Sequence, residues 1–363
     1  MLVTLIVFLL ILSVLILVHE LGHFLMAKKF GIFVEEFGFG LPPRLFGFKR
    51  GETIYSINYL PFGGFVKLYG EEGLENTGKK KIAKNRAFYT RPVWQRVVVI
   101  SAGVVMNFLL AIVIISYIFT RGVMVPTQNV HIEKIVENSP AEAAGLKEGD
   151  RINKISIISE TGGKEEIVIN STDLLINTTK KYPDKEITLE IFRNGQNLSV
   201  NIIPRSDYPE NQGPMGILIS NFEEKKYSLL EAPVMGLKES VFLSWELIKG
   251  IGKTLWKLAT LQSVSKDVAG PIGIAQMTGE AIKFGHNAVL EMLGLLSLNL
   301  AIINILPFPA LDGGRLLFVL IEGFTGKRVK TNWERYIHQI GMVILLLLVI
   351  LVTVNDLVRF FSK

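Results

Sequence analysis

The stretch MLVTLIVFLLILSVLILVHELGH, residues 1–23, decides the fold of this chain and ends in the motif His19-Glu20-Leu21-Gly22-His23. Residues 1–18 are almost wholly apolar and carry no charged side chain. A helix needs roughly 20 residues to cross a bilayer. The stretch therefore predicts a membrane helix with a polar motif at one end. A signal peptide is the alternative, but a basic start and a small-residue cleavage site are both missing.

The rest of the chain repeats this apolar character. Of its 363 residues, 49% are hydrophobic, and the mean hydropathy is +0.38. Further long apolar runs cover residues 93–119, 288–306 and 341–354, and the last run extends to 333–361 when its polar start is included. This composition excludes an ordinary soluble enzyme of this size. We predict a polytopic α-helical membrane protein with about four transmembrane helices.

Charge predicts how these helices are oriented. The net charge is +6, and basic residues gather between the first two helices and in the run 327–330. Short basic flanks stay in the cytoplasm, so both segments are expected inside and both termini outside. The basic run 79–84 lacks interleaved aromatic residues, which favours lipid headgroups over nucleic acid as its partner. Cysteine is absent, so disulfides and thiolate metal ligands are excluded.

Four segments follow from this pattern. Residues 1–122 form a first membrane half, in which residues 54–69 are expected to make a small membrane-associated β-hairpin of two short strands around a bend. Residues 123–222 are polar and long enough for one inserted α+β domain. Residues 223–283 include an amphipathic helix, 232–261, expected on the outer membrane surface. Residues 284–363 form the second membrane half.

The inserted domain has a recognisable pattern. Ser139-Pro140 predicts the start of a short helix that Gly145 ends, and Gly149-Asp150 leads into a strand at 151–157. With strands at 187–192 and 198–203 around the turn 193–195, the segment resembles PDZ domains. That resemblance implies a strand that accepts a peptide by β-addition. The residues of this groove are expected to be Gly213, Gly216 and Ile217.

The chemistry resides in the histidine motif. On a helix, His19 and His23 project from one face, as two imidazoles that share a zinc ion must. Glu20 is then the neighbour that can take a proton from water. A coincidental cluster at a helix end is the alternative, but ionisable groups beside a long apolar run are costly.

Catalytic zinc usually has a third protein ligand. Asp312 is the best candidate, because it follows the third apolar helix and two prolines, and helices one and three are both expected to run inward. Gly313-Gly314 are expected to allow an unusual backbone there, and a simple turn or capping aspartate is the alternative. For the remaining histidines we expect surface or packing roles: His131, His286 and His338.

Together, His19-Glu20-Leu21-Gly22-His23 and Leu311-Asp312-Gly313 resemble the paired motifs of the site-2 proteases, in particular the bacterial regulator-of-sigma-E group. The family's Gly-x-x-x-Asn is matched by Gly103 and Asn107, and its Asn-x-x-Pro-x-Pro by Asn304, Pro307 and Pro309. The segment Gly270-Pro271-Ile272-Gly273-Ile274 also looks like part of the family. The similarity covers essentially the whole chain.

The resemblance implies a zinc endopeptidase of the bacterial cytoplasmic (inner) membrane, with one Zn²⁺ per chain held by His19, His23 and Asp312. Its substrates would be single-pass membrane proteins, such as anti-sigma factors or remnant signal peptides, cut first by another protease. The β segment, with Gly63, Gly64 and Phe65, would pair with the unwound substrate, unless it is a purely structural hairpin.

Two asparagines are the last candidate site residues. Asn107 and Asn304 are expected to bind substrate or an oxyanion, although hydrogen bonds between helices would equally explain them.

One rival function is a non-catalytic membrane scaffold that binds peptide ends. The other is a zinc transporter, which would need more ionisable residues within the spans than the sequence provides.

Overall fold

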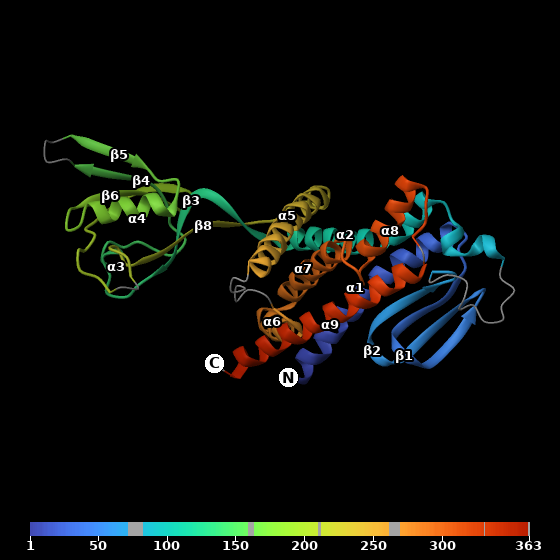
Figure 1. Ribbon diagram of the computed structural model, residues 1–363. Helices are drawn as coiled ribbons and strands as arrows, with labels where there is room; N and C mark the ends of the chain where they lie inside the picture. Colours follow the sequence, from blue (N-terminus) through green and yellow to red (C-terminus); the bar gives the residue numbers. More distant parts are fainter. Residues whose placement is uncertain (72–82, 159–162, 210–211, 261–268, 330, 362–363) are drawn as a thin grey trace. The chain divides into compact units, whose positions relative to one another are not determined.

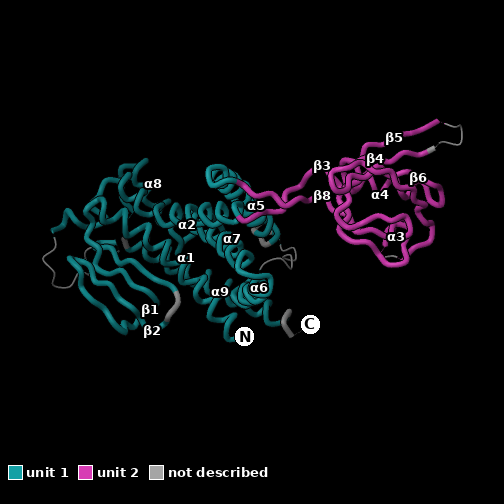
Figure 2. Tube along the Cα trace, turned by 180° about the vertical axis from the view of Figure 1, so that it is seen from behind, with its two compact units in different colours: residues 1–120, 228–363 teal, residues 121–227 magenta. Residues whose placement is uncertain are grey.

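The computed structural model describes residues 1–71, 83–158, 163–209, 212–260, 269–329 and 331–361. It divides into two compact units (Figure 2). The first unit combines Met1–Thr120 with Ser228–Lys363, and the second is Arg121–Tyr227. The basic run 79–84 lies largely outside the described residues.

Four helices of the first unit are long and apolar enough to cross a membrane. They are α1 (Leu2–Lys29), α2 (Val93–Arg121), α7 (His286–Ile305) and α9 (Thr331–Phe361) (Figure 1). The predicted polytopic membrane protein is thereby confirmed. The first helix continues beyond His23 to Lys29, so the histidine motif lies within α1.

Three further helices belong to the same unit: α5 (Ala232–Ala259), α6 (Pro271–Phe284) and α8 (Asp312–Thr325). The predicted helix at 232–261 corresponds to α5, which packs on α7. Helix α8 was not predicted, because its 14 residues are too few for a membrane span and its first turn contains two glycines. Helix α8 ends at Gly326, which adopts the left-handed conformation that stops helices.

A small sheet packs against α1 and consists of β1 (Val34–Arg50) and β2 (Thr53–Leu68). Both strands are long and bent, and Phe37 of β1 pairs with both Tyr55 and Val66 of β2. The first part of β1 therefore lies between two parts of β2. Residues 54–69 were predicted to form two short strands around a bend, but the structure has one continuous strand there, β2, which pairs with β1. The partner β1 was not predicted, because Pro42 and Pro43 interrupt the strand pattern.

The second unit is a sheet with two helices. Its strands follow the order β7-β6-β4-β3-β8, and β5 pairs with β4. The elements are β3 (Val123–Ile135), α3 (Pro140–Ala143), β4 (Arg151–Ile158), β5 (Lys164–Val168), α4 (Thr172–Lys181), β6 (Ile187–Arg193), β7 (Gln196–Ile202) and β8 (Ile217–Lys225). Ser139 caps α3 by accepting a hydrogen bond from the Glu142 amide. Isoleucines dominate the core, including Ile132, Ile155 and Ile191.

Glu52, in the turn between β1 and β2, ties the small sheet to its surroundings. Its carboxylate accepts hydrogen bonds from both terminal nitrogens of Arg86, at 2.7 and 2.8 Å, and from Nζ of Lys28 at 2.8 Å. The Arg86 guanidinium, with Lys28, lowers the pKa of Glu52 to about 2. The sheet is thereby fixed to the end of the helix that carries the histidine motif.

We expect Glu52→Gln to lower the Tm at neutral pH, and this deficit to shrink in acid. A carboxyl with a depressed pKa stabilises the fold above its ordinary pKa of 4.5 and loses that contribution as the pH falls through about 2. Melting curves of the detergent-purified protein from about pH 6 to about pH 3 measure the difference. Glu35→Gln is the control, because its partner Lys67 is largely exposed. A deficit independent of pH would contradict the ion-pair explanation.

Candidate metal centre

The site begins with one face of α1. His19 and His23 are one helical turn apart, and both are buried, with exposed fractions of 7% and 8%. Their Nε2 atoms lie 3.2 Å from one another. Helical periodicity alone places the two side chains together, as the sequence analysis expected.

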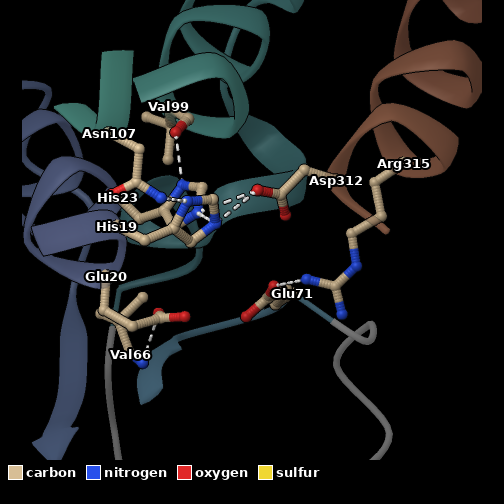
Figure 3. Close-up of polar contacts among 9 residues, drawn as sticks. All are labelled: His19, Glu20, His23, Val66, Glu71, Val99, Asn107, Asp312 and Arg315. Atoms are coloured by element: carbon tan, nitrogen blue, oxygen red, sulfur yellow. Dashed lines mark hydrogen bonds and ion pairs between the residues drawn. The ribbon is translucent and has the colours of Figure 1, made fainter. Parts of the chain in front are cut away.

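Asp312 reaches the histidines from 293 residues away in sequence. It is the first residue of α8, where the helix dipole favours a carboxylate. Its Oδ2 lies 2.9 Å from Nε2 of His19 and 3.2 Å from Nε2 of His23 (Figure 3). Burial alone would raise the pKa of Asp312, but its contacts with the two histidines outweigh burial and hold the pKa below its usual range.

Gly313 and Gly314 have a different role from the one expected. Both lie in helical conformation within α8, not in an unusual backbone. A methyl group at Gly313 would lie 2.1 Å from the Leu306 carbonyl oxygen, and one at Gly314 would lie 2.4 Å from that of Phe308. The glycines are therefore needed for space, since α8 starts directly against the turn that follows α7.

The three side chains fit a zinc ion. Their ligand atoms all lie within 4.8 Å of one another, and two imidazoles with one carboxylate are a common zinc donor set. The edges of a zinc tetrahedron are about 3.3 Å long, given bonds of about 2.0 Å. The separations of 2.9, 3.2 and 3.2 Å agree with that size.

The second nitrogen of His23 strengthens this assignment. Its Nδ1 lies 2.8 Å from the carbonyl oxygen of Val99, which can only accept, so Nδ1 carries a proton. In a neutral ring Nε2 then presents a lone pair to the carboxylate of Asp312. Such converging lone pairs require a positive charge among them, and this arrangement is typical of metal-ligating histidines.

Glu20 lies beside the cluster and is held by the small sheet. Its Oε2 accepts a hydrogen bond of 3.0 Å from the backbone amide of Val66 in β2 (Figure 3). No hydrogen bond to the second carboxylate oxygen is found among the described residues, so this oxygen can accept a proton. The sheet thus determines where the carboxylate next to the two histidines lies.

A cavity of about 540 Å³ opens onto this cluster and is lined by Glu20, His23 and Asp312. Several polar residues of its wall were not anticipated: Glu71, Arg315, Glu334, Arg335, His338 and Gln339. Arg315 pairs with Glu71 at the end of the small sheet (Figure 3). Its position three residues after Asp312 was the available sequence signal, because both then lie in the first turn of α8.

His338, for which a surface or packing role was expected, is part of this wall. Its Nδ1 accepts a 3.0 Å hydrogen bond from the amide of Ala310, a residue with a positive φ of 78°. At Gly341, one turn further along α9, an added methyl group would lie 2.3 Å from Cβ of Pro309. Helix α9 therefore packs closely against the loop that leads to Asp312.

The remaining predicted residues are distributed as follows. Phe65 lines the cavity, Gly64 lies next to it, and Gly63 has a positive φ of 84°. Asn107 is fully buried against His19. Asn304 is half-buried near the end of α7 and is not among the described residues that line the cavity.

The other candidates lie elsewhere. His286 begins α7, and His131 pairs with Glu223 in the second unit at 2.7 Å. Gly213, Gly216 and Ile217 lead into β8 of that unit, and β8 is the terminal strand of the sheet as described. Within the described residues, His19, His23 and Asp312 form the one cluster suited to a metal ion.

Comparison with known proteins places the whole chain in one group. The model of peptidase family M50 matches residues 7–348. The zinc metalloprotease RasP of Bacillus licheniformis is 31% identical, over 99% of both chains. The regulator of sigma-W protease RasP of Bacillus subtilis is also 31% identical, over 99% of both chains. The zinc metalloprotease RasP of Geobacillus kaustophilus is 31% identical, over 98% of this chain and 97% of its own.

We expect Gly103→Ala to abolish stable metal binding. A methyl group there would lie 2.4 Å from Nε2 of His23 and 2.7 Å from Cε1 of His19, so the imidazoles would be displaced. Metal content of the purified protein, measured by mass spectrometry, should fall well below that of the parent. Gly294→Ala is the matched control, since its methyl group would meet Ile114 at an ordinary 3.4 Å. Equal metal content in the Gly103 variant would contradict the tight fit.

Proposed function

This chain belongs to peptidase family M50 and is a zinc metalloprotease, and we propose that it cleaves single-pass membrane proteins within their transmembrane segments. One observation carries the proposal. The ligand atoms of His19, His23 and Asp312 converge beside Glu20, at a cavity whose wall includes residues of α1, α2 and α9, three helices apolar enough to cross a membrane.

In the proposed mechanism, His19, His23 and Asp312 hold one zinc ion per chain. When bound, zinc supplies Lewis acidity that polarises a peptide carbonyl and makes water more acidic. Glu20 acts as the general base, because its free oxygen can take the proton of the attacking water and later return it to the leaving amine. The Val66 amide holds the other oxygen of Glu20, which limits the motion of the base.

The last part of β2 is the proposed docking strand for the substrate. A transmembrane helix keeps its carbonyls hydrogen-bonded, so the substrate must unwind before water can attack one of them. An extended segment that pairs beside Gly63, Gly64 and Phe65 would be held close to Glu20. Support comes from Phe65 in the cavity wall and from the bond between Glu20 and the next residue, Val66. Asn304 stays a candidate for a substrate contact.

We assign the protein to the bacterial cytoplasmic membrane, with the active site towards the cytoplasm and both termini outside. The density of basic residues between α1 and α2 supports this orientation. One relative is named a regulator of sigma-W protease. Anti-sigma factors, and remnant signal peptides of similar form, are therefore the proposed substrates. The proposal includes a first cut of these substrates by another protease.

The second unit is proposed to be a PDZ-like domain that filters substrates on the outer side. Its short helix α3, which Ser139 caps and Pro140 begins, the turn at Asn194-Gly195 and the terminal strand β8 support that proposal. A free strand edge can accept a peptide as an added strand. Gly213, Gly216 and Ile217 are the proposed groove residues. A bulky outer domain on an uncut substrate would be excluded.

We expect Glu20→Gln to eliminate cleavage while zinc stays bound. Glutamine keeps the shape and the hydrogen bond to Val66 but cannot take a proton. Activity on a co-expressed single-pass substrate should fall by at least about 10²-fold, the usual contribution of a general base. Immunoblotting of the fragments and metal analysis of the same preparation measure both properties. Cleavage at the parental rate would refute the proposed role of Glu20.

We expect the size filter to disappear when residues 127–221 are replaced by a short Gly-Ser linker. The cut is chosen because Pro126 and Phe222 are strand partners, so a short linker can join them. The variant should cleave a substrate with its outer domain intact as fast as one already trimmed. The parent should prefer the trimmed substrate, and an unchanged preference in the variant would exclude this filter.

A further inference from the structure

One stripe of α2 forms the wall behind the two histidines. Val99, Gly103 and Asn107 are spaced by four residues and therefore lie on one helical face. The Val99 carbonyl faces Nδ1 of His23, and Gly103 leaves room for both rings. Asn107 lies next to His19, with its Nδ2 3.3 Å from Nδ1 of the imidazole (Figure 3).

Asn107 is buried behind the two histidines, away from the cavity. Its exposed fraction is 0%, and among the described residues it does not line the cavity. Its backbone carbonyl accepts a 2.8 Å hydrogen bond from the Ser297 hydroxyl of α7. The expected contact with substrate or an oxyanion therefore does not account for this side chain.

The donor and acceptor ends of the Asn107 amide do not match their surroundings. Its Oδ1 is buried and has no hydrogen-bond partner among the described residues, while Nδ2 faces His19. A buried carbonyl oxygen without a donor costs about 1–3 kcal/mol. The two ends of an amide have nearly the same shape, so their assignment rests on the hydrogen bonds around them.

A second mismatch arises on the histidine. His19 directs Nε2 at Asp312 and at His23. To use that Nε2 as a metal ligand, a neutral imidazole must carry its proton on Nδ1. The amide nitrogen of Asn107 and this N–H would then both be donors facing each other. A half-turn of the amide gives Oδ1 a donor, the Nδ1 proton of His19, and removes the contact between two donors.

We propose that Asn107 is a positioning residue for the metal ligand His19, with its amide oxygen accepting the Nδ1 proton. The bond selects the tautomer that leaves Nε2 free and fixes the plane of the ring. This inference rests on the proposed ligand role of His19. Asn107 then has the same relation to His19 as the Val99 carbonyl has to His23. Both partners of the metal-binding histidines belong to α2.

The expected effect is on metal affinity. Losing the hydrogen-bond partner of a ligating histidine typically weakens metal binding about 10–100-fold. Asn107→Leu has a similar size and no acceptor, so it should show this loss. Asn107→Asp supplies an acceptor of the same shape and no donor, so it should hold zinc at least as tightly as the parent. The aspartate variant therefore reports which end of the amide faces His19.

The experiment is a chelator competition on the full-length protein purified in detergent. The chelator concentration that removes half of the zinc is measured for each variant, independently of proteolysis. Ser297→Ala is the matched control, since it loosens the same contact between α2 and α7 without changing the amide. It should release zinc at the parental concentration.

The outcomes separate clearly. Zinc retention by the leucine variant at the parental level, or equal weakening in the leucine and aspartate variants, would overturn the proposal. If the leucine variant does not fold, the aspartate variant decides alone, with weaker binding counting against the proposal. His19→Ala tests the premise separately. If that variant keeps its zinc, the proposed ligand set fails, whatever Asn107 does.

Discussion

Three lone-pair-bearing atoms, two imidazole nitrogens and one carboxylate oxygen, are held within 4.8 Å of one another in the first unit, and the rest of the unit is arranged to permit this. Helices α1 and α2 must approach one another closely for these atoms to converge. A methyl group at Gly22 would lie 2.3 Å from the Ala102 carbonyl oxygen, and one at Gly103 would strike the imidazoles. Small residues at helix contacts allow this approach in membranes. Space, as much as chemistry, explains the glycines around the site.

Helix α8 brings the third ligand atom and is fixed at both ends. Near its end, the buried Arg96 of α2 binds Glu322 through two hydrogen bonds, at 2.5 and 2.9 Å. Near its start, Arg315 pairs with Glu71 beside the small sheet. Charged groups buried in an apolar protein persist when they are paired. These two ion pairs hold the helix that begins with Asp312.

The small sheet is hydrogen-bonded to the helix of the histidine motif at two places. Glu52 connects it to Lys28 at the end of α1, and the Val66 amide binds Glu20 in the middle of the same helix. The carboxylate proposed as general base is therefore coupled to the strand proposed to receive substrate. A change in that strand would be transmitted to the base through a single hydrogen bond.

The sequence by itself determined the features that are local. Long apolar runs predicted the four membrane-spanning helices, since length and hydropathy decide what crosses a bilayer, and helical spacing put His19 and His23 on one face. The third ligand was a hypothesis from the expected direction of the helices and from resemblance, because no local rule joins residues 293 apart. Only the tertiary structure showed that Gly313 and Gly314 serve close packing and that the first part of β1 lies between two parts of β2. It also placed Asn107 against His19 instead of in the cavity. Such contacts depend on how helices and strands distant in sequence pack together, and the spacing of residues along one chain does not specify that.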